Sequence, residues 1–218
     1  MMRSQYDEEL RRLGGELQRM GALCEEAIAD ASKALLENDP ALREAAFAAD
    51  DRIDGMERDI EQLCLRLLLR QQPVAADLRF ISSALKLISD LERIGDQASD
   101  IAELSRHLEK APLRSERLAE MARQAVQMVS GGVRAYAARD LELARQIIAA
   151  DDVLDGLFID YKDELAGRLR GGEDSAALLD LLMVAKYLER IGDHATNVAE
   201  WAEYAVTGVH PRTAERRG

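Results

Sequence analysis

Residues 91–96 read Leu-Glu-Arg-Ile-Gly-Asp, and residues 188–193 read the same six residues without a change. A second matching pair lies upstream of each copy: residues 48–55 read AADDRIDG, and residues 149–156 read AADDVLDG. The first pair is offset by 97 residues and the second by 101. Two matched pairs in the same order predict that the chain contains one supersecondary unit twice.

Between the matched stretches, apolar residues recur three and four positions apart, as in Ile81, Leu85, Ile88 and Leu91. This period is typical of amphipathic helices, and the four prolines lie where the period breaks. The pattern predicts six long helices, over residues 5–38, 40–71, 74–108, 114–138, 140–170 and 174–207. We therefore expect an all-α fold, a tandem repeat of two three-helix bundles with antiparallel helices.

The predicted domain organisation follows the repeat. The first bundle is expected over residues 1–110, the second over 114–208, and a flexible tail over 209–218. The segment Lys110–Ser115, which contains Pro112, is the expected boundary between the bundles. The connection Arg70–Arg79 is polar yet differs between the copies, so it is a candidate partner surface or an ordinary helix connection.

Composition excludes several classes of protein. The chain has 218 residues, 47% hydrophobic and only 4% aromatic, which argues against an all-β sandwich. Its net charge of -12 argues against nucleic-acid binding, which needs clustered Lys and Arg. No apolar run approaches the roughly 20 residues of a spanning helix, and the N-terminal residues do not resemble a leader. We expect a cytoplasmic protein in which Cys24 and Cys64 are reduced core thiols.

Acidic residues four apart accompany both matched pairs. Because such residues lie one above the other on a helix face, they form ladders of carboxyl groups, which repel each other unless a cation lies between them. The ladders of each copy lie on the same flank of neighbouring antiparallel helices, so they converge on one surface groove if the loops bring them to the same height. The sequence does not determine that height. The candidate metal ligands are Asp50, Asp54, Glu92, Asp96 and Asp100 in the first copy, and Asp151, Asp155, Glu189, Asp193 and Asn197 in the second.

The donor set consists of oxygen atoms, which suit hard ions such as Mg²⁺, Mn²⁺, Ca²⁺ or ferric iron. We therefore predict divalent or trivalent metal ions, among them Mg, Mn, Fe or Zn. Asn197 replaces an acid, which predicts that the second site is the weaker one. The competing interpretation is a set of solvated helix faces without metal. The three histidines are expected on the surface or in the tail, although His194 follows Asp193 and is a possible further ligand.

Two other residue types accompany the ladders. Gly95 and Gly192 lie on the apolar side of their helices, where the missing side chain allows another helix to approach closely. Arg93 and Arg190 are expected either to neutralise nearby acids or to be solvated. Catalytic signatures are missing: no histidine follows a glutamate by three residues, and there is no phosphate-binding glycine loop. We expect no enzyme, with a metal-dependent phosphoester hydrolase as the less favoured alternative.

The run RQQPVAADLR at residues 70–79, followed by DLERIGD at 90–96, resembles the PhoU family of phosphate-signalling regulators. Met20-Gly21 and the second ERIGD at 189–193 belong to the same likeness, which covers about residues 5–207. The resemblance implies a tandem pair of three-helix bundles, usually dimeric. It also implies metal-binding motifs with two acids four apart, which match the 50/54, 92/96, 151/155 and 189/193 pairs.

The resemblance further implies a function. Such a protein is expected to be a negative regulator of phosphate uptake and of phosphate-starvation signalling. Its partners are expected to be the ATPase of a phosphate ABC transporter and a sensor histidine kinase. A metal-free helical interaction protein is the alternative that the residues themselves leave open.

Overall fold

The computed structural model describes residues 2–71, 73, 75–109 and 115–209. Every regular element in these ranges is an α-helix, so the all-α prediction is confirmed. Each of the six predicted helices is present, with ends within three residues of the predicted ones. The helices are α1 (Met2–Glu37), α2 (Pro40–Gln71), α3 (Ala75–His107), α4 (Glu116–Ala138), α5 (Leu141–Arg170) and α6 (Ser175–Thr207).

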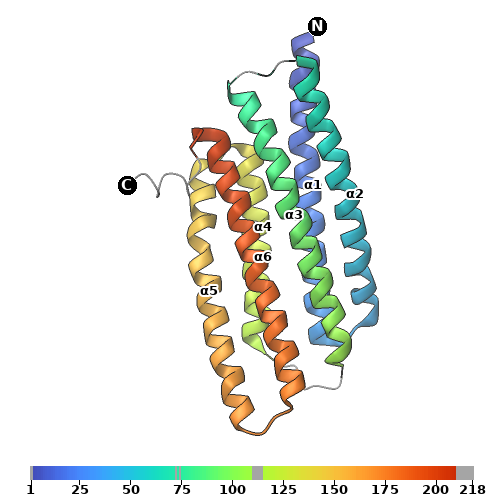
Figure 1. The fold of residues 1–218 in the computed structure, drawn as a ribbon, viewed down its shortest axis with the longest axis vertical. Helices are drawn as coiled ribbons and strands as arrows, with labels where there is room; N and C mark the ends of the chain where they lie inside the picture. The colour runs from blue at the N-terminus through green and yellow to red at the C-terminus, as the bar shows by residue number, and fades with distance from the viewer. Residues whose placement is uncertain (1, 72, 74, 110–114, 210–218) are drawn as a thin grey trace.

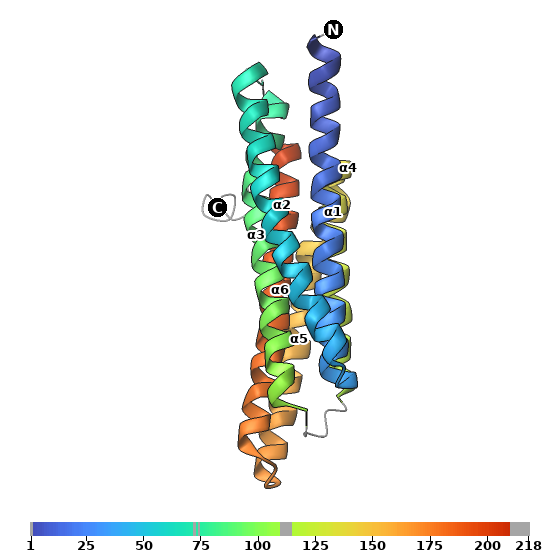
Figure 2. The same ribbon diagram turned by 90° about the vertical axis from the view of Figure 1, so that its right-hand side faces the viewer.

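The six helices form two three-helix units that lie side by side along their length (Figure 1). The first unit contains α1, α2 and α3, and the second contains α4, α5 and α6. Across the units, α3 packs on α6 and α1 packs on α4, so these four helices form the centre of the molecule (Figure 2). Among the described residues, α2 contacts only α1 and α3, and α5 contacts only α4 and α6.

The core is one continuous cluster of buried apolar side chains drawn from all six helices. Its largest fully buried members include Leu17 from α1, Ile81 from α3 and Tyr136 from α4. Cys24 and Cys64 belong to this cluster as free, buried thiols, which confirms their predicted place in the core. Since the two units share one core, burial of apolar surface holds them together as well as holding each unit together.

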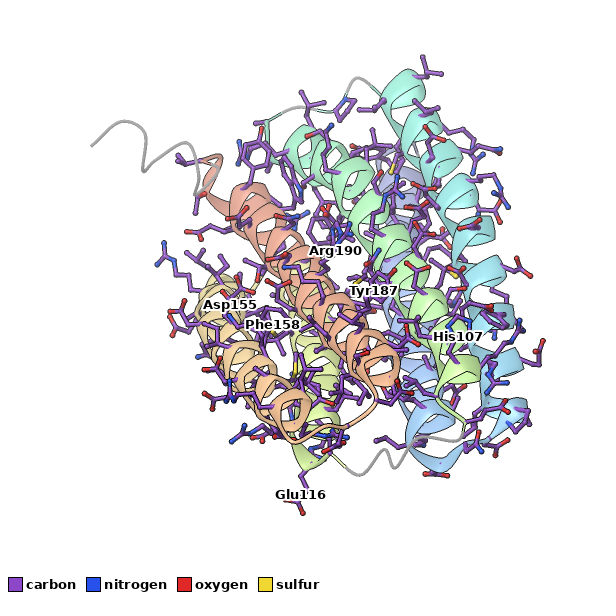
Figure 3. All side chains as sticks on the ribbon, turned by 60° about the horizontal axis from the view of Figure 1, so that its bottom comes forward. His107, Glu116, Asp155, Phe158, Tyr187 and Arg190 are labelled. Carbon is purple, nitrogen blue, oxygen red and sulfur yellow. The ribbon has the colours of Figure 1, made fainter. Side chains whose placement is uncertain are left out.

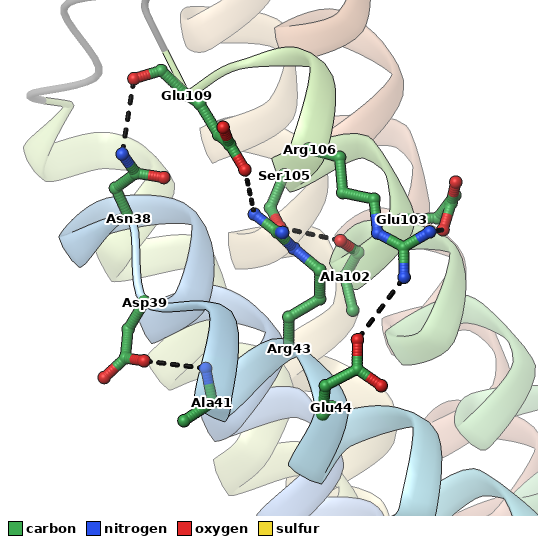
Figure 4. Close-up of polar contacts among 10 residues, drawn as sticks. All are labelled: Asn38, Asp39, Ala41, Arg43, Glu44, Ala102, Glu103, Ser105, Arg106 and Glu109. Carbon is green, nitrogen blue, oxygen red and sulfur yellow. Dashed lines mark hydrogen bonds and ion pairs between the residues drawn. The ribbon is translucent and has the colours of Figure 1, made fainter.

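Polar contacts at the start of α2 fix its position against α3 (Figure 4). Asp39 accepts a hydrogen bond from the backbone N–H of Ala41 at 2.8 Å, which satisfies a donor at the helix start. Arg43 is 5% exposed, and its guanidinium donates to Ser105 Oγ at 2.8 Å and to Glu109 Oε1 at 3.1 Å. Because a buried charge needs such partners, these contacts select one register of α2 on α3.

Some predictions concern segments outside the described residues. Residues 110–114 are the centre of the bundle boundary, and residues 72 and 74 belong to the 70–79 connection. Residues 210–218 make up nearly all of the tail. Within the described part of the chain, none of the helices has an apolar stretch long enough to cross a bilayer.

Candidate functional site

The acid ladders of the first copy face each other across α2 and α3. Repulsion from Asp54 and Glu57 on α2 contributes to a raised pKa of Glu92 on α3, although burial is the larger cause. Asp96 on α3 in turn acts on Asp50 on α2. The predicted convergence of the two ladders is therefore observed. We call this group the first acidic cluster; it consists of Asp50, Asp54, Glu57, Glu92 and Asp96.

Asp50 is the most strongly perturbed carboxyl group of this cluster. Burial, reinforced by the charges of Asp96 and Asp54, raises its pKa from 3.8 to about 6, against a hydrogen bond from Ser99 that lowers it. Its Oδ1 atom is buried without a hydrogen-bond partner. A Cβ atom at Gly95 would lie 2.8 Å from that oxygen, so the glycine allows α2 and α3 to approach closely here. The prediction for Gly95 is confirmed.

The second copy repeats the arrangement between α5 and α6. The pKa of Asp151 is raised by burial first, then by the charges of Asp155 and Asp193. The pKa of Asp155 is likewise raised by burial first and then by Glu189. We call Asp151, Asp155, Glu189 and Asp193 the second acidic cluster. A Cβ atom at Gly192 would clash with the side chain of Leu154, so this glycine also allows close packing of its helix pair.

Each cluster contains a basic side chain, but the two come from different positions. Arg93 lies 3.4 Å from Glu92 Oε2 and 2.9 Å from Asp96 Oδ2, which confirms the neutralising role that was one of its two expected roles. In the second cluster, Lys186 forms an ion pair with Glu189, and its charge lowers the pKa of Asp155.

Lys186 also lies over the ring of Phe158, with Nζ 5.3 Å from the ring centroid. In the first copy, the positions equivalent to Phe158 and Lys186 hold Glu57 and Ser89, which are hydrogen-bonded at 3.3 Å. The spacing of the acids did not point to Glu57 or Lys186. A residue-by-residue comparison at the offsets of 101 and 97 identifies both differences.

Asp100 and Asn197 lie where α3 packs on α6, which we call the α3–α6 seam, although the charge of Asp96 in the first cluster also acts on Asp100. Asp100 accepts a hydrogen bond from Tyr187 and interacts with Arg190. Figure 3 shows Tyr187 and Arg190 on the side of α6 that faces α3, whereas Asp155 and Phe158 lie on α5. Asn197 Nδ2 donates to Asp90 Oδ1 at 3.0 Å.

The two seam contacts are equivalent under the repeat. Positions 90 and 187 correspond to each other at the offset of 97, as do positions 100 and 197. In one contact the acid is Asp100 and the donor is Tyr187; in the other the acid is Asp90 and the donor is Asn197. Asn197 therefore replaces an acid because its partner across the seam is itself an acid. In each contact a donor on α6 faces a carboxylate on α3.

His194 also belongs to the seam. Its Nδ1 lies 2.9 Å from Asp90 Oδ1, and its side chain is only 19% exposed. The expectation of a surface histidine is wrong here, because packing of α3 on α6 covers the side chain. His107, in contrast, is 59% exposed, as expected of a surface residue.

The clusters suit an oxygen-preferring cation in donor chemistry, and Asp50 Oδ1 is a buried acceptor without a hydrogen-bond partner. Their present arrangement is not a formed metal centre. Among the described residues, no three side chains of His, Cys, Asp or Glu lie in a geometry that would hold a metal ion. Binding in the first cluster would require the carboxylates paired with Arg93 to reorient. Metal ligation by the ten predicted residues stays a prediction.

Comparison with known proteins places this arrangement in a family. The family model of the PhoU domain matches twice, over residues 17–105 and 118–202. A phosphate-specific transport system accessory protein PhoU homolog from Clostridium acetobutylicum is 37% identical, over 95% of this chain and 97% of its own length. The homolog of the same name from Pseudomonas aeruginosa is 36% identical, over 95% of this chain and 88% of its own length.

Solved structures agree with the sequence comparison. The crystal structure of PhoU from Pseudomonas aeruginosa superposes with a TM-score of 0.88 at 35% identity, covering 94% of this chain and all of that one. The structure of the phosphate transport system regulatory protein PhoU from Streptococcus pneumoniae gives a TM-score of 0.88 at 29% identity and covers 94% of this chain and 98% of that one. With both domain matches on the two helical units that carry the acidic clusters, the chain belongs to the PhoU family.

Proposed function

We propose that this protein is a negative regulator of phosphate uptake and phosphate-starvation signalling. It acts in the cytoplasm, as a homodimer, as an adaptor between the ATPase of a phosphate ABC transporter and a sensor histidine kinase. The observation that carries the proposal is the match of both helical units to the PhoU domain. The relatives named as accessory or regulatory proteins of phosphate transport support it, and none of those described above has an enzyme name.

The fold suits an adaptor. Its helices contain between 23 and 36 residues and lie side by side, which gives long, stiff outer faces for docking. The net charge of -12 makes those faces unfavourable for an acidic partner until cations neutralise them. We therefore propose that ions bound at the acidic clusters adjust the surface charge that a partner meets.

The regulatory role is tested by deleting the gene in its host. Phosphate-scavenging genes are expected to switch on in medium rich in phosphate, measured as alkaline phosphatase activity or transcript level. Wild-type protein supplied from a plasmid is expected to restore repression. If the deletion strain keeps these genes repressed in rich phosphate, the regulatory proposal is wrong.

The role of metal needs a separate experiment. The double variant Glu92→Gln with Asp96→Asn removes two donors of the first cluster and is expected to lose its bound ion, measured by elemental analysis. The control is Glu103→Gln, an exposed acid of α3 that pairs with Arg106 at 3.0 Å. Affinity for the cytoplasmic part of the kinase is then measured with and without a chelator. An affinity that the chelator does not change removes metal from the mechanism.

The ion pairs of Arg93 and Lys186 favour a second candidate function. Since these two side chains already neutralise part of each cluster, the protein would also serve as a helical interaction protein without metal. Elemental analysis of protein purified without a histidine tag separates the two candidates. In this second case the preparation contains no stoichiometric metal but still binds its partners.

A further inference from the structure

The two copies differ at a pair of facing positions that lie three residues from the acids, next to Asp155 on α5 and Glu189 on α6. In the second copy, the Lys186 ammonium contacts Glu189 and lies 5.3 Å from the centroid of the Phe158 ring. In the first copy, the equivalent residues are Ser89 and Glu57, joined by a hydrogen bond. The second copy thus replaces one carboxylate by an aromatic ring and one hydroxyl by a cation.

Phe158 gives the ammonium a defined position. A cation over an aromatic face is attracted by the negative electrostatic potential of the ring, and the attraction increases as water is removed. The Glu189 side chain beside it is only 14% exposed, and the Lys186 side chain is 43% exposed. The ring and the carboxylate therefore hold the ammonium at the edge of the second acidic cluster, which comprises α5 and α6 residues.

The basic partners of the clusters also differ: Arg93 is an exposed side chain, 59% exposed, whereas Lys186 is less exposed and lies over an aromatic ring. Arg93 pairs with acids of its own cluster, whereas its equivalent Arg190 acts on Asp100 and Tyr187 at the α3–α6 seam. Without an arginine, the second cluster has Lys186 as its basic partner among the interactions described above. The charge of Lys186 reaches Asp155 on α5 as well as Glu189 on α6.

From this geometry we propose that Lys186 is a built-in counter-cation of the second acidic cluster, so that this cluster takes up no metal ion and the first is the cation-responsive one. The inference rests on the proposed function and narrows it, since it confines to the first cluster the cation response that was proposed for both clusters. It also gives a different reason why the two copies would differ in metal binding: Lys186, rather than Asn197, disfavours an ion at the second cluster.

The test removes the ammonium in a protein whose first cluster is already disabled. In the Glu92→Gln, Asp96→Asn background, Mn²⁺ or Mg²⁺ is expected to leave the melting temperature unchanged. Adding Lys186→Met is expected to create an ion response, with binding at least about tenfold tighter than in the background protein. At an ion concentration of about ten times Kd, the melting temperature is expected to rise by about 3 to 6 °C.

The matched control is Lys162→Met, which removes a lysine on α5 that lines a pocket with Leu165 and Leu182 further along the same helix pair. It is expected to create no ion response. Lys186→Ser, the residue of the first copy, serves if the methionine variant does not fold. An unchanged ion response in the folded Lys186 variant overturns the inference, because the lysine is then only a surface ion-pair partner.

The reciprocal exchange tests the first copy. In the otherwise wild-type protein, Glu57→Phe combined with Ser89→Lys is expected to abolish the ion response of the first cluster. If the wild-type protein shows no ion response but the Lys186→Met variant gains one, the metal part of the proposed function fails. The assignment of the cation response to the first cluster fails with it, while the counter-cation role of Lys186 stands. If the wild type responds to ions and the Lys186 variant gains nothing, the inference fails alone.

Discussion

Asp50 carries a negative charge where water cannot solvate it fully. Its pKa is raised to about 6, so the folded protein holds this proton more tightly than the unfolded chain does. Ionisation therefore opposes folding: the cost is absent below about pH 4, grows between pH 4 and 6, and is complete above pH 6. Stability is expected to fall as the pH rises through this window.

The first prediction concerns Asp50→Asn in chelator-treated protein. The variant is expected to be more stable than wild type at pH 7 by about 1–2 kcal/mol, allowing for solvent screening of a half-buried group. At pH 4 the two proteins are expected to have equal stability, because Asp50 is then protonated. Urea unfolding at each pH measures the difference.

Asp51→Asn is the control, since it changes the same charge at an exposed neighbouring position. It is expected to leave unchanged the slope of the free energy of unfolding against pH between pH 4 and 6. If the free energy of unfolding has the same slope against pH in wild type and in Asp50→Asn, the Asp50 carboxylate is not the source of the pH dependence.

The second prediction concerns Asn197→Asp at the α3–α6 seam. The new carboxylate would lie about where Nδ2 now stands, 3.0 Å from Asp90 Oδ1. Repulsion and loss of the donor are expected to destabilise the protein by about 1–3 kcal/mol at pH 7. Adding Asp90→Asn replaces one of the two facing carboxylates by an amide and is expected to recover part of the loss in a double-mutant cycle, although it also changes the partner of His194. If the stability changes of the two single variants simply add in the double variant, residues 90 and 197 are not paired.

At the scale of the helix pair, close approach depends on glycine. The third prediction is that Gly192→Ala destabilises the protein by about 1–3 kcal/mol, because its methyl group would clash with Leu154 where α6 packs on α5. Thermal or urea unfolding measures the change. Leu154→Ala in the same chain is expected to make the alanine at 192 less harmful, since it removes the clashing atoms.

Gly156→Ala is the matched control within the same helix pair. A Cβ atom at Gly156 would meet nothing within 4 Å, so alanine there is expected to stabilise α5 by about 0.5–1 kcal/mol through its helix propensity. Opposite signs at 156 and 192 would separate helix propensity from helix contact. Equal destabilisation at both positions would disprove the packing role of Gly192.

Sequence patterning was sufficient for the helices and for the flank on which each ladder lies, but it left the relative heights of the ladders undetermined. The period of apolar residues and the proline positions locate six helices, and the repeat shows that the two halves share one design. Gly95 and Gly192 are identifiable because a glycine inside a helix needs a reason, and close packing is one. These are properties of single helices or of neighbouring pairs, which spacing along the chain determines directly.

The sequence pattern did not predict the contacts between the two three-helix units. Asp100 and Asn197 were assigned to the ladders because they continue the spacing of four. In the structure they contact α6 and α3 residues instead, since these central helices pack on each other. His194 was expected at the surface because the pattern of its own helix does not show that α3 covers it. Which face of α3 meets α6 depends on how the units associate, and the period of one helix does not determine that.

At the scale of the whole molecule, a shared core implies shared unfolding. The fourth prediction is that both units unfold in one cooperative transition. Trp201 on α6 is the single tryptophan and reports the second unit, while far-UV circular dichroism reports all six helices. The two signals are expected to coincide in urea.

A core variant in the first unit provides the control. Ile53 on α2 is fully buried, so Ile53→Ala is expected to cost about 2–4 kcal/mol. If the units are coupled, this change in the first unit also shifts the Trp201 transition in the second. A Trp201 midpoint that stays at the wild-type value would show that the units unfold independently.

The outer helices α2 and α5 each rest on two neighbours, whereas the central helices form a mutually supporting group. Segments with less packing open locally at lower free energy, so amide hydrogens of α2 and α5 are expected to exchange before those of the centre. Each acidic cluster joins one such edge to the interior. If the proposed roles hold, Lys186 would stabilise the contact of α5 with α6 at all times, whereas the contact of α2 with α3 would depend on the ions that the surroundings supply.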